Sequence, residues 1–178
     1  QGPMQGHAYP QCGTERLFAD GKFAFPSGRA RLVPVGPGRL AETTSEARPF
    51  VLNTGRVRDQ WHTMTRTGTS PRLAVHVSEP FVEIHPQDAA ALGLAQAMLA
   101  RVETRYGAAV LRVMLSEQQQ RGSLFAPIHW SAENSSAARV CAMVQPHTDP
   151  FSGQPEAKAT PARVTALPVS TFGFVLSR

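Results

Sequence analysis

Cysteine and recognisable catalytic motifs are scarce in this sequence. Only Cys12 and Cys141 occur among 178 residues, too few for a disulfide framework and not spaced as CxxC, so we expect a reducing, cytoplasmic setting. The six histidines show no HxH, HxxxH or Cys/His spacing, and GxGxxG, P-loop and GxSxG motifs are missing. The sequence therefore argues against a zinc site. It identifies no catalytic centre, although a catalytic group assembled in space stays open.

Long apolar runs and aromatic residues are also few. The longest apolar runs, such as 89–95, fall far short of the roughly 20 residues that span a bilayer, and no signal peptide is visible, so we expect no membrane partner. The aromatic content is 7%. The chain begins Gln-Gly-Pro instead of with methionine, which predicts a piece cut from a longer protein.

Glycine, proline and positive charge are plentiful. The 14 Gly and 15 Pro indicate short elements joined by many turns, which favours a β-rich domain. The net charge is +5 and the pI about 10.0, a balance that suits nucleic acid, a phosphorylated cofactor, a small anion or an acidic protein. Charge alone does not choose among these partners.

Alternating or short apolar runs predict a mainly β fold with one or two short helices. The expected strands are 30–35, 50–54, 81–84, 98–105, 108–115, 123–128, 139–144 and 162–169, and a helix is expected over 85–94. Six or seven main strands predict a closed or nearly closed barrel, because closure removes exposed edges. We expect an extended lead-in with short strands at 1–48, a barrel domain at 49–168 and a C-terminal extension at 169–178. Within this extension, residues 172–176 would be an unpaired strand or would lead into a missing segment.

Three polar loops follow expected strands, at 55–71, 129–136 and 147–158. The first contains RVRDQWHTMTRTG, in which arginines and threonines suit phosphate and Trp61 could stack on a heterocycle. Gly55 would let a ligand approach the backbone, and Asp59 could accept a hydrogen bond from a purine amino group. The alternative is a basic surface hairpin whose threonines satisfy its own backbone.

The other two loops give weaker indications of binding. In the second, His129, Trp130 and Asn134 could contact a ligand, but Trp130 could equally plug one end of the barrel while His129 satisfies a backbone carbonyl. In the third, Lys158 could meet a phosphate or pterin, although the segment also has the composition of an ordinary turn.

Five motifs occur together in a specific order: LNTGR at 52–56, QWHTMTR at 60–66, IHPQDA at 84–89, PIHW at 127–130 and DPFSGQPEAK at 149–158. Over residues 15–168 the chain resembles the C-terminal molybdopterin dinucleotide-binding domain of the dimethyl-sulfoxide-reductase family. Within it, the resemblance is closest to the large subunit of bacterial assimilatory nitrate reductases.

This resemblance implies a double-psi β-barrel of the aspartate-decarboxylase-like type and a bis-molybdopterin guanine dinucleotide cofactor carrying molybdenum. It also implies two-electron reduction of nitrate to nitrite, a 4Fe-4S cluster in the absent N-terminal part, and partners in the remaining domains and an electron donor protein or reductase subunit. The isolated domain would be inactive and would supply no catalytic residue or metal ligand. The implied cofactor contacts are Thr54, Gly55, Arg56, Trp61, His62, Thr63, Thr65, His129, Trp130, Asn134 and Lys158.

Two other functions stay open at this stage. One is a basic barrel that binds single-stranded nucleic acid through arginines and aromatic side chains. Against it, the arginines cluster in one loop and aromatic residues are few. The other is a barrel that recognises a protein partner, for which the Trp-His-Thr sequence at 61–63 has no evident purpose.

Overall fold

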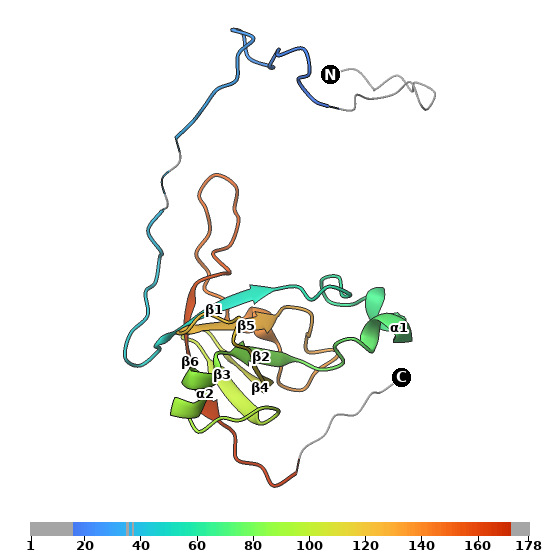
Figure 1. Cartoon of the computed structure of the whole chain (residues 1–178), viewed down its shortest axis with the longest axis vertical. Coiled ribbons are helices and arrows are strands. Elements are labelled where there is room, and N and C mark those ends of the chain that lie inside the picture. Colours follow the sequence, from blue (N-terminus) through green and yellow to red (C-terminus); the bar gives the residue numbers. More distant parts are fainter. Residues whose placement is uncertain (1–15, 35, 37, 172–178) are drawn as a thin grey trace. The chain divides into compact units, whose positions relative to one another are not determined.

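The structure, a computed structural model, describes residues 16–34, 36 and 38–171. Six strands close into one barrel in the order β1-β5-β2-β4-β3-β6, shown in Figure 1. The strands are β1 (Phe50–Gly55), β2 (Phe81–Ile84), β3 (Leu99–Glu103), β4 (Ala108–Leu115), β5 (Ser123–Pro127) and β6 (Thr160–Ala166). The helices are α1 (Pro71–Ala74), α2 (Pro86–Ala91) and the 3-10 turns η1 (Thr67–Thr69) and η2 (Val140–Met143). The prediction of a mainly β, double-psi barrel with few short helices is confirmed.

Two strand pairs in the barrel are parallel and the other four are antiparallel. β1 runs parallel to β5, and β2 runs parallel to β4, so each pair needs a connection that crosses the barrel instead of a tight hairpin. β3 and β4 form the predicted antiparallel hairpin. The barrel has no unpaired edge strand because β6 pairs with both β1 and β3.

The core fills the barrel with aliphatic side chains from alternating strand positions. In β4 the pattern places Ala109, Leu111 and Val113 inside while their neighbours are more exposed. Leu52 of β1 and Leu124 of β5 are fully buried beside them. This period of two is the pattern that the sequence predicted for strands with one face on the core.

The helix α2 also follows from its sequence. Pro86 occupies the first helical turn, and the His85 side chain caps it by accepting from the Gln87 amide. Gly93 ends the segment at φ +67°, a left-handed conformation that glycine adopts without steric cost.

Three strand predictions differ from the structure. Residues 139–144 were expected to be a strand, but Val140–Met143 form the turn η2, which buries Val140 and Met143 without pairing with a strand. The described residues 16–34 contain no strand, and the expected strand at 30–35 ends at a residue outside the described ranges. The last strand starts at Thr160, two residues earlier than expected, and ends at Ala166. The expected strand at 172–176 lies outside the described residues.

The chain divides into two compact units, residues up to Arg39 and residues from Leu40 onward. In the first unit, Phe18 stacks on Phe23 with ring centroids 4.7 Å apart. In the second, the segment before β1 contacts the barrel: the Tyr106 hydroxyl donates to Glu42, and the Ala41 amide donates to Glu156 at 3.2 Å. Within the described ranges, no helix has the length and apolar character needed to cross a membrane.

Candidate functional site

The parallel pairing of β1 with β5 brings the first two polar loops together. Gly55, the last residue of β1, lies opposite Pro127 at the end of β5, and the Ile128 amide donates to the Gly55 carbonyl at 2.9 Å. Both loops therefore start from the same end of the barrel, the arrangement that places binding residues at the carboxyl ends of parallel strands. Figure 1 shows the β1-to-β2 segment, which includes α1, extending from one side of the barrel.

His129 joins these two loops from a buried position. Its Nε2 accepts a hydrogen bond from the Val57 amide at 2.9 Å, and its Nδ1 lies 2.6 Å from the His62 carbonyl oxygen. The side chain is 0% exposed. Burial lowers the pKa of His129 below its ordinary value of 6.5, and the nearby charges of Arg56 and His62 lower it further, while the bond to the His62 carbonyl opposes them.

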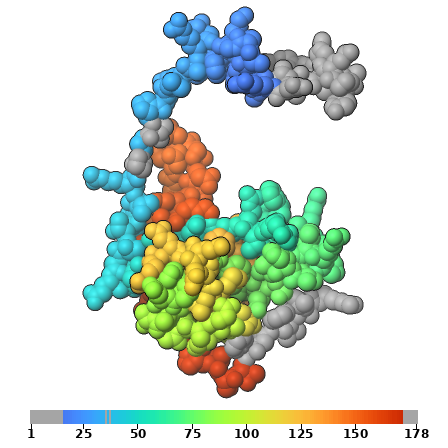
Figure 2. All heavy atoms as spheres, viewed as in Figure 1, coloured from blue at the N-terminus to red at the C-terminus, as the bar shows by residue number. Residues whose placement is uncertain are grey.

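An exposed cationic and aromatic cluster occupies the outer surface of the first loop. The Arg56 guanidinium lies over the Trp61 ring, 4.6 Å from its centroid. The His62 ring meets Trp61 edge-on at 4.5 Å. Trp61 is 60% exposed, and Figure 2 shows the teal-to-green segment to which it belongs projecting from the barrel. The cluster can offer a flat apolar face and a forked cation to one ligand.

The interior of the same loop is held by Gln60, which the sequence did not single out, and by Thr67, one of the threonines that the sequence suggested for phosphate. Gln60 is 5% exposed; its Oε1 accepts from the Thr67 hydroxyl at 2.6 Å, and that hydroxyl also accepts from the Trp61 amide at 3.2 Å. The hydroxyls of Thr63 and Thr65 lie 3.2 Å apart on the exposed side. Thr67 therefore serves the loop's own structure, whereas Thr63 and Thr65 have hydroxyls that a ligand could reach.

The third loop reaches the end of β1 as well. The Thr54 hydroxyl donates to the Ala157 carbonyl at 2.8 Å, and the Lys158 ammonium donates to the Thr54 carbonyl. Thr54 is 2% exposed, so its side chain links the third loop to β1. Lys158 also borders a surface hollow of about 460 Å³ with Asn53 and Ser123.

The second loop divides its predicted residues between core and surface. Trp130 is 6% exposed and belongs to the hydrophobic core, as the alternative interpretation of that residue expected. Asn134 is exposed, and its Oδ1 accepts from the Ser131 amide at 2.7 Å, which closes a turn. The structure thus brings the three loops together around β1 but does not place all eleven predicted residues on one surface.

Two polar groups of the first loop are engaged with each other. Arg58 donates to both carboxylate oxygens of Asp59, at 2.9 and 3.0 Å, and His76 Nδ1 lies 3.0 Å from the same carboxylate. The Arg58 hydrogen bonds hold the pKa of Asp59 below its ordinary value. Both carboxylate oxygens of Asp59 are therefore engaged by Arg58 and His76. Because Arg58 is paired with Asp59 while Arg56 lies over the Trp61 ring, Arg56 is the better placed of these two cations for a ligand.

Gly55 has a packing reason that the sequence did not reveal. A Cβ at this position would lie 2.7 Å from the Phe125 ring, closer than carbon atoms can approach without movement. Phe125 in turn packs against Phe81, with centroids 6.1 Å apart. The tight contact is with the protein's own side chain, and contact with a ligand stays a prediction.

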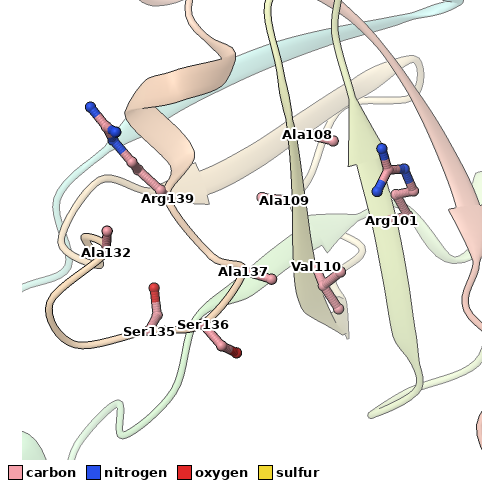
Figure 3. A pocket seen from close by; sticks show the side chains of 9 residues that line it. All are labelled: Arg101, Ala108, Ala109, Val110, Ala132, Ser135, Ser136, Ala137 and Arg139. Atoms are coloured by element: carbon pink, nitrogen blue, oxygen red, sulfur yellow. The ribbon is translucent and has the colours of Figure 1, made fainter.

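A further hollow of about 250 Å³ lies beside the second loop. Figure 3 shows Arg101 and Arg139 at its two sides, with small side chains such as Ala109 and Ala137 between them. Arg101 is paired with Glu103 at 3.2 Å, and Arg139 on the other side is exposed. Among the described residues, no group of three or more His, Cys, Asp or Glu could hold a metal ion.

Residues 50–161 match the family model described as "Molydopterin dinucleotide binding domain". The chain belongs to this family. The match begins at β1 and includes all three loops. The resemblance stated from the five motifs is therefore confirmed.

Several relatives agree with this assignment, and a solved structure shares the fold. The chain is 41% identical to a nitrate reductase of Klebsiella oxytoca over 96% of its length, 34% to the assimilatory nitrate reductase catalytic subunit of Bacillus subtilis over 85%, and 34% to an F420-dependent formate dehydrogenase subunit alpha of Methanocaldococcus jannaschii over 68%. It spans 20%, 21% and 18% of these relatives. Acetylene hydratase from Pelobacter acetylenicus has a similar fold, with a TM-score of 0.56 and 19% identity over 66% of this chain and 18% of that one.

Proposed function

We propose that this chain is the cofactor-binding domain of a molybdenum-dependent nitrate reductase that acts in nitrate assimilation. The domain, residues 49–168, would bind bis-molybdopterin guanine dinucleotide. The single observation that favours this function most is the exposed Arg56–Trp61 pair at the end of β1. The family match over residues 50–161 supports a dinucleotide as the ligand and lies within the proposed bounds.

The chemistry of the exposed groups fits a dinucleotide with fused rings and phosphates. Arg56 offers several donors in a fork that matches a phosphate, and the Trp61 face suits a flat heterocycle. The Thr63 and Thr65 hydroxyls lie on the exposed side of the same loop and can donate to phosphate or pterin oxygens. The Lys158 ammonium, next to Thr54, adds a cation from the third loop.

The cofactor, when bound, supplies the molybdenum at which nitrate accepts two electrons. The residues of this chain bind and orient it: Arg56 neutralises phosphate charge, and Trp61 excludes water from one ring face. Fixed donors of this kind position a cofactor and tune its electronics without taking part in bond making. On this proposal the chain contributes no catalytic residue.

The remaining parts of the reductase would lie outside this chain. They would include the domains that hold the 4Fe-4S cluster and the molybdenum ligand, and a protein or subunit that donates electrons. The nitrate reductase relatives favour nitrate over formate as substrate, and the assimilatory relative favours the cytoplasm.

The test is cofactor content. The polypeptide that carries this chain should be purified without oxygen from cells that make the cofactor, and its molybdenum and the GMP released by acid hydrolysis should be measured. We expect two GMP per molybdenum. Replacing Arg56, Trp61 and His62 together by alanine should lower both at least about tenfold, since several contacts of about 1 kcal/mol or more are lost.

A matched control replaces Arg101, Arg105 and His85, which lie elsewhere on the barrel surface, by alanine, and it should retain the cofactor. Full cofactor content in the first triple variant would reject the site assignment. Absence of molybdenum and GMP from the unchanged protein would reject the function. Formate oxidation without nitrate reduction would reject the substrate alone.

A further inference from the structure

The bonds made by His129 fix both ends of a short segment, from Val57 to His62, in the first loop. We propose that His129 is a positioning residue: as a neutral imidazole it sets the shape of this segment and thereby the placement of Arg56 and Trp61, and it does not touch the cofactor itself. The inference rests on the proposed function for the identity of the ligand. The loop contacts that support it are independent of any ligand.

The hydrogen bonds leave only one protonation state for the ring. A backbone amide can only donate, so the nitrogen facing Val57, Nε2, must lack a proton. A carbonyl oxygen can only accept, so the nitrogen facing His62, Nδ1, must have one. Of the two neutral tautomers and the cation, only the Nδ1–H tautomer satisfies both partners.

The two anchored residues lie directly beside the exposed cluster. Arg56 immediately precedes Val57, and Trp61 immediately precedes His62. The distance from the Arg56 guanidinium to the Trp61 centroid, 4.6 Å, therefore depends on how far apart the two anchor points are held. One buried side chain fixes that separation by bonding to both.

The backbone of the anchored segment needs this support. His62 has φ +42°, in the left-handed region that non-glycine residues adopt at a cost. Such conformations persist only where surrounding contacts hold them. The bond from His129 to the His62 carbonyl is a contact of this kind, made from a neighbouring loop.

His129 is poorly placed to be a ligand contact. The side chain is 0% exposed, and both ring nitrogens are bonded to backbone atoms of the first loop. A cofactor could reach it only if the loop opened. The effect of His129 on the cofactor must therefore pass through the loop.

The required protonation state makes the loop sensitive to pH. A second proton on the His129 ring would point an N–H at the N–H of Val57 and break that hydrogen bond. The added positive charge would also be opposed by Arg56 and His62, the charged and titratable groups that act on the ring. Because burial lowers the pKa of His129 in the folded protein, the contribution to stability is complete above the ordinary pKa of 6.5. It is lost as the pH falls through the lowered value.

The experiment uses the ¹⁵N-labelled chain without cofactor. NMR of the unchanged protein at pH 7.5 should show a proton on Nδ1 of His129 and none on Nε2, with the Val57 amide protected from hydrogen exchange. That protection should fall when the pH is lowered below 6.5, after correction for the intrinsic exchange rate. These measurements need no variant.

Variants then separate the two bonds. His129→Phe keeps a ring but removes both bonds, and the exchange of the Val57 amide should accelerate at least roughly tenfold. His129→Gln can accept from Val57 but cannot also reach the His62 carbonyl as a donor, so Val57 should stay more protected than in His129→Phe. His85→Gln is the matched control: that histidine also accepts from an amide, at 3.1 Å, but caps α2, and its replacement should leave Val57 unchanged.

Each outcome decides the inference. A proton on Nε2, or a Val57 amide that exchanges equally fast in His129→Phe and the unchanged protein, would overturn it. If His129→Phe does not fold, the tautomer and the pH dependence of the unchanged protein still decide. If the Val57 amide is protected from hydrogen exchange but the protein never binds the cofactor, the proposed function is rejected and the role of His129 in the loop is retained.

Discussion

Replacement of Gly55 by alanine tests whether this glycine is required by packing. The added Cβ would lie 2.7 Å from Phe125 Cε2 and 3.4 Å from its Cζ. Phe125 is half-buried and packs against Phe81, so its ring can move only by disturbing a second aromatic side chain. Overpacking of this kind costs about 1–3 kcal/mol.

A compensating gain must be subtracted from this cost. Gly55 is a strand residue of β1, and alanine is favoured over glycine in a strand by roughly 0.5–1 kcal/mol because the unfolded chain loses less entropy. The net loss should be about 0–2.5 kcal/mol with a midpoint near 1 kcal/mol, which lowers the melting temperature by roughly 2–4 °C at that midpoint in a chain of this size. Thermal unfolding followed by circular dichroism measures it.

Phe125→Leu provides the matched background. Leucine removes the ring atoms that the new Cβ would strike, so Gly55→Ala should cost less than about 0.5 kcal/mol in that background, a coupling expected for residues in contact. An equal cost in both backgrounds would refute the argument that Phe125 excludes a side chain at position 55.

Two further predictions concern other parts of the barrel. Gly107→Ala should destabilise the chain by about 3 kcal/mol, more than Gly55→Ala. Its Cβ would lie 2.6 Å from the backbone oxygen of Ala142, which cannot rotate away as a side chain can. Urea unfolding measures this loss, with Gly36→Ala as the control because a Cβ at position 36 meets nothing within 4 Å. Asp88→Asn should cost about 1–3 kcal/mol at pH 7, because the buried carboxylate accepts from Gly122 at 2.7 Å and from Arg121 at 3.0 Å. Burial alone would raise the pKa of Asp88, but these hydrogen bonds outweigh it and leave the pKa below 3.8. The stabilisation is therefore complete above pH 3.8 and is lost as the pH falls through the lowered pKa. A stability difference between Asp88→Asn and the unchanged protein that did not shrink over this pH range would contradict the stabilising role of the carboxylate.

Local patterns predicted most of the elements correctly, and their failures have physical causes. Strands β1, β2, β4 and β5 were found because side chains alternate between core and solvent, or run apolar where the strand is enclosed. The segment 140–143 has the same apolar content as a strand, yet it forms the turn η2. Composition does not distinguish a buried turn from a buried strand, since both remove the same side chains from water.

The candidate site was predicted in part for a similar reason. The Arg56, Trp61 and His62 cluster was recognisable because such residues in a polar loop have no place in a core. Gln60 was missed because its role, a bond to Thr67 at 2.6 Å, depends on how the loop folds back on itself. The spacing of residues in the sequence does not predict the hydrogen bond between Gln60 and Thr67.

The sequence by itself determined that the chain forms a β-rich domain with polar loops after its strands, and its ordered motifs indicated the family. Only the tertiary structure decided which loops meet. The parallel pairing of β1 with β5 joins residues about seventy positions apart, and it places His129 beneath Val57 and His62. Hydrogen bonds over such separations depend on the closed barrel as a whole, so they leave no local periodicity from which they could be predicted.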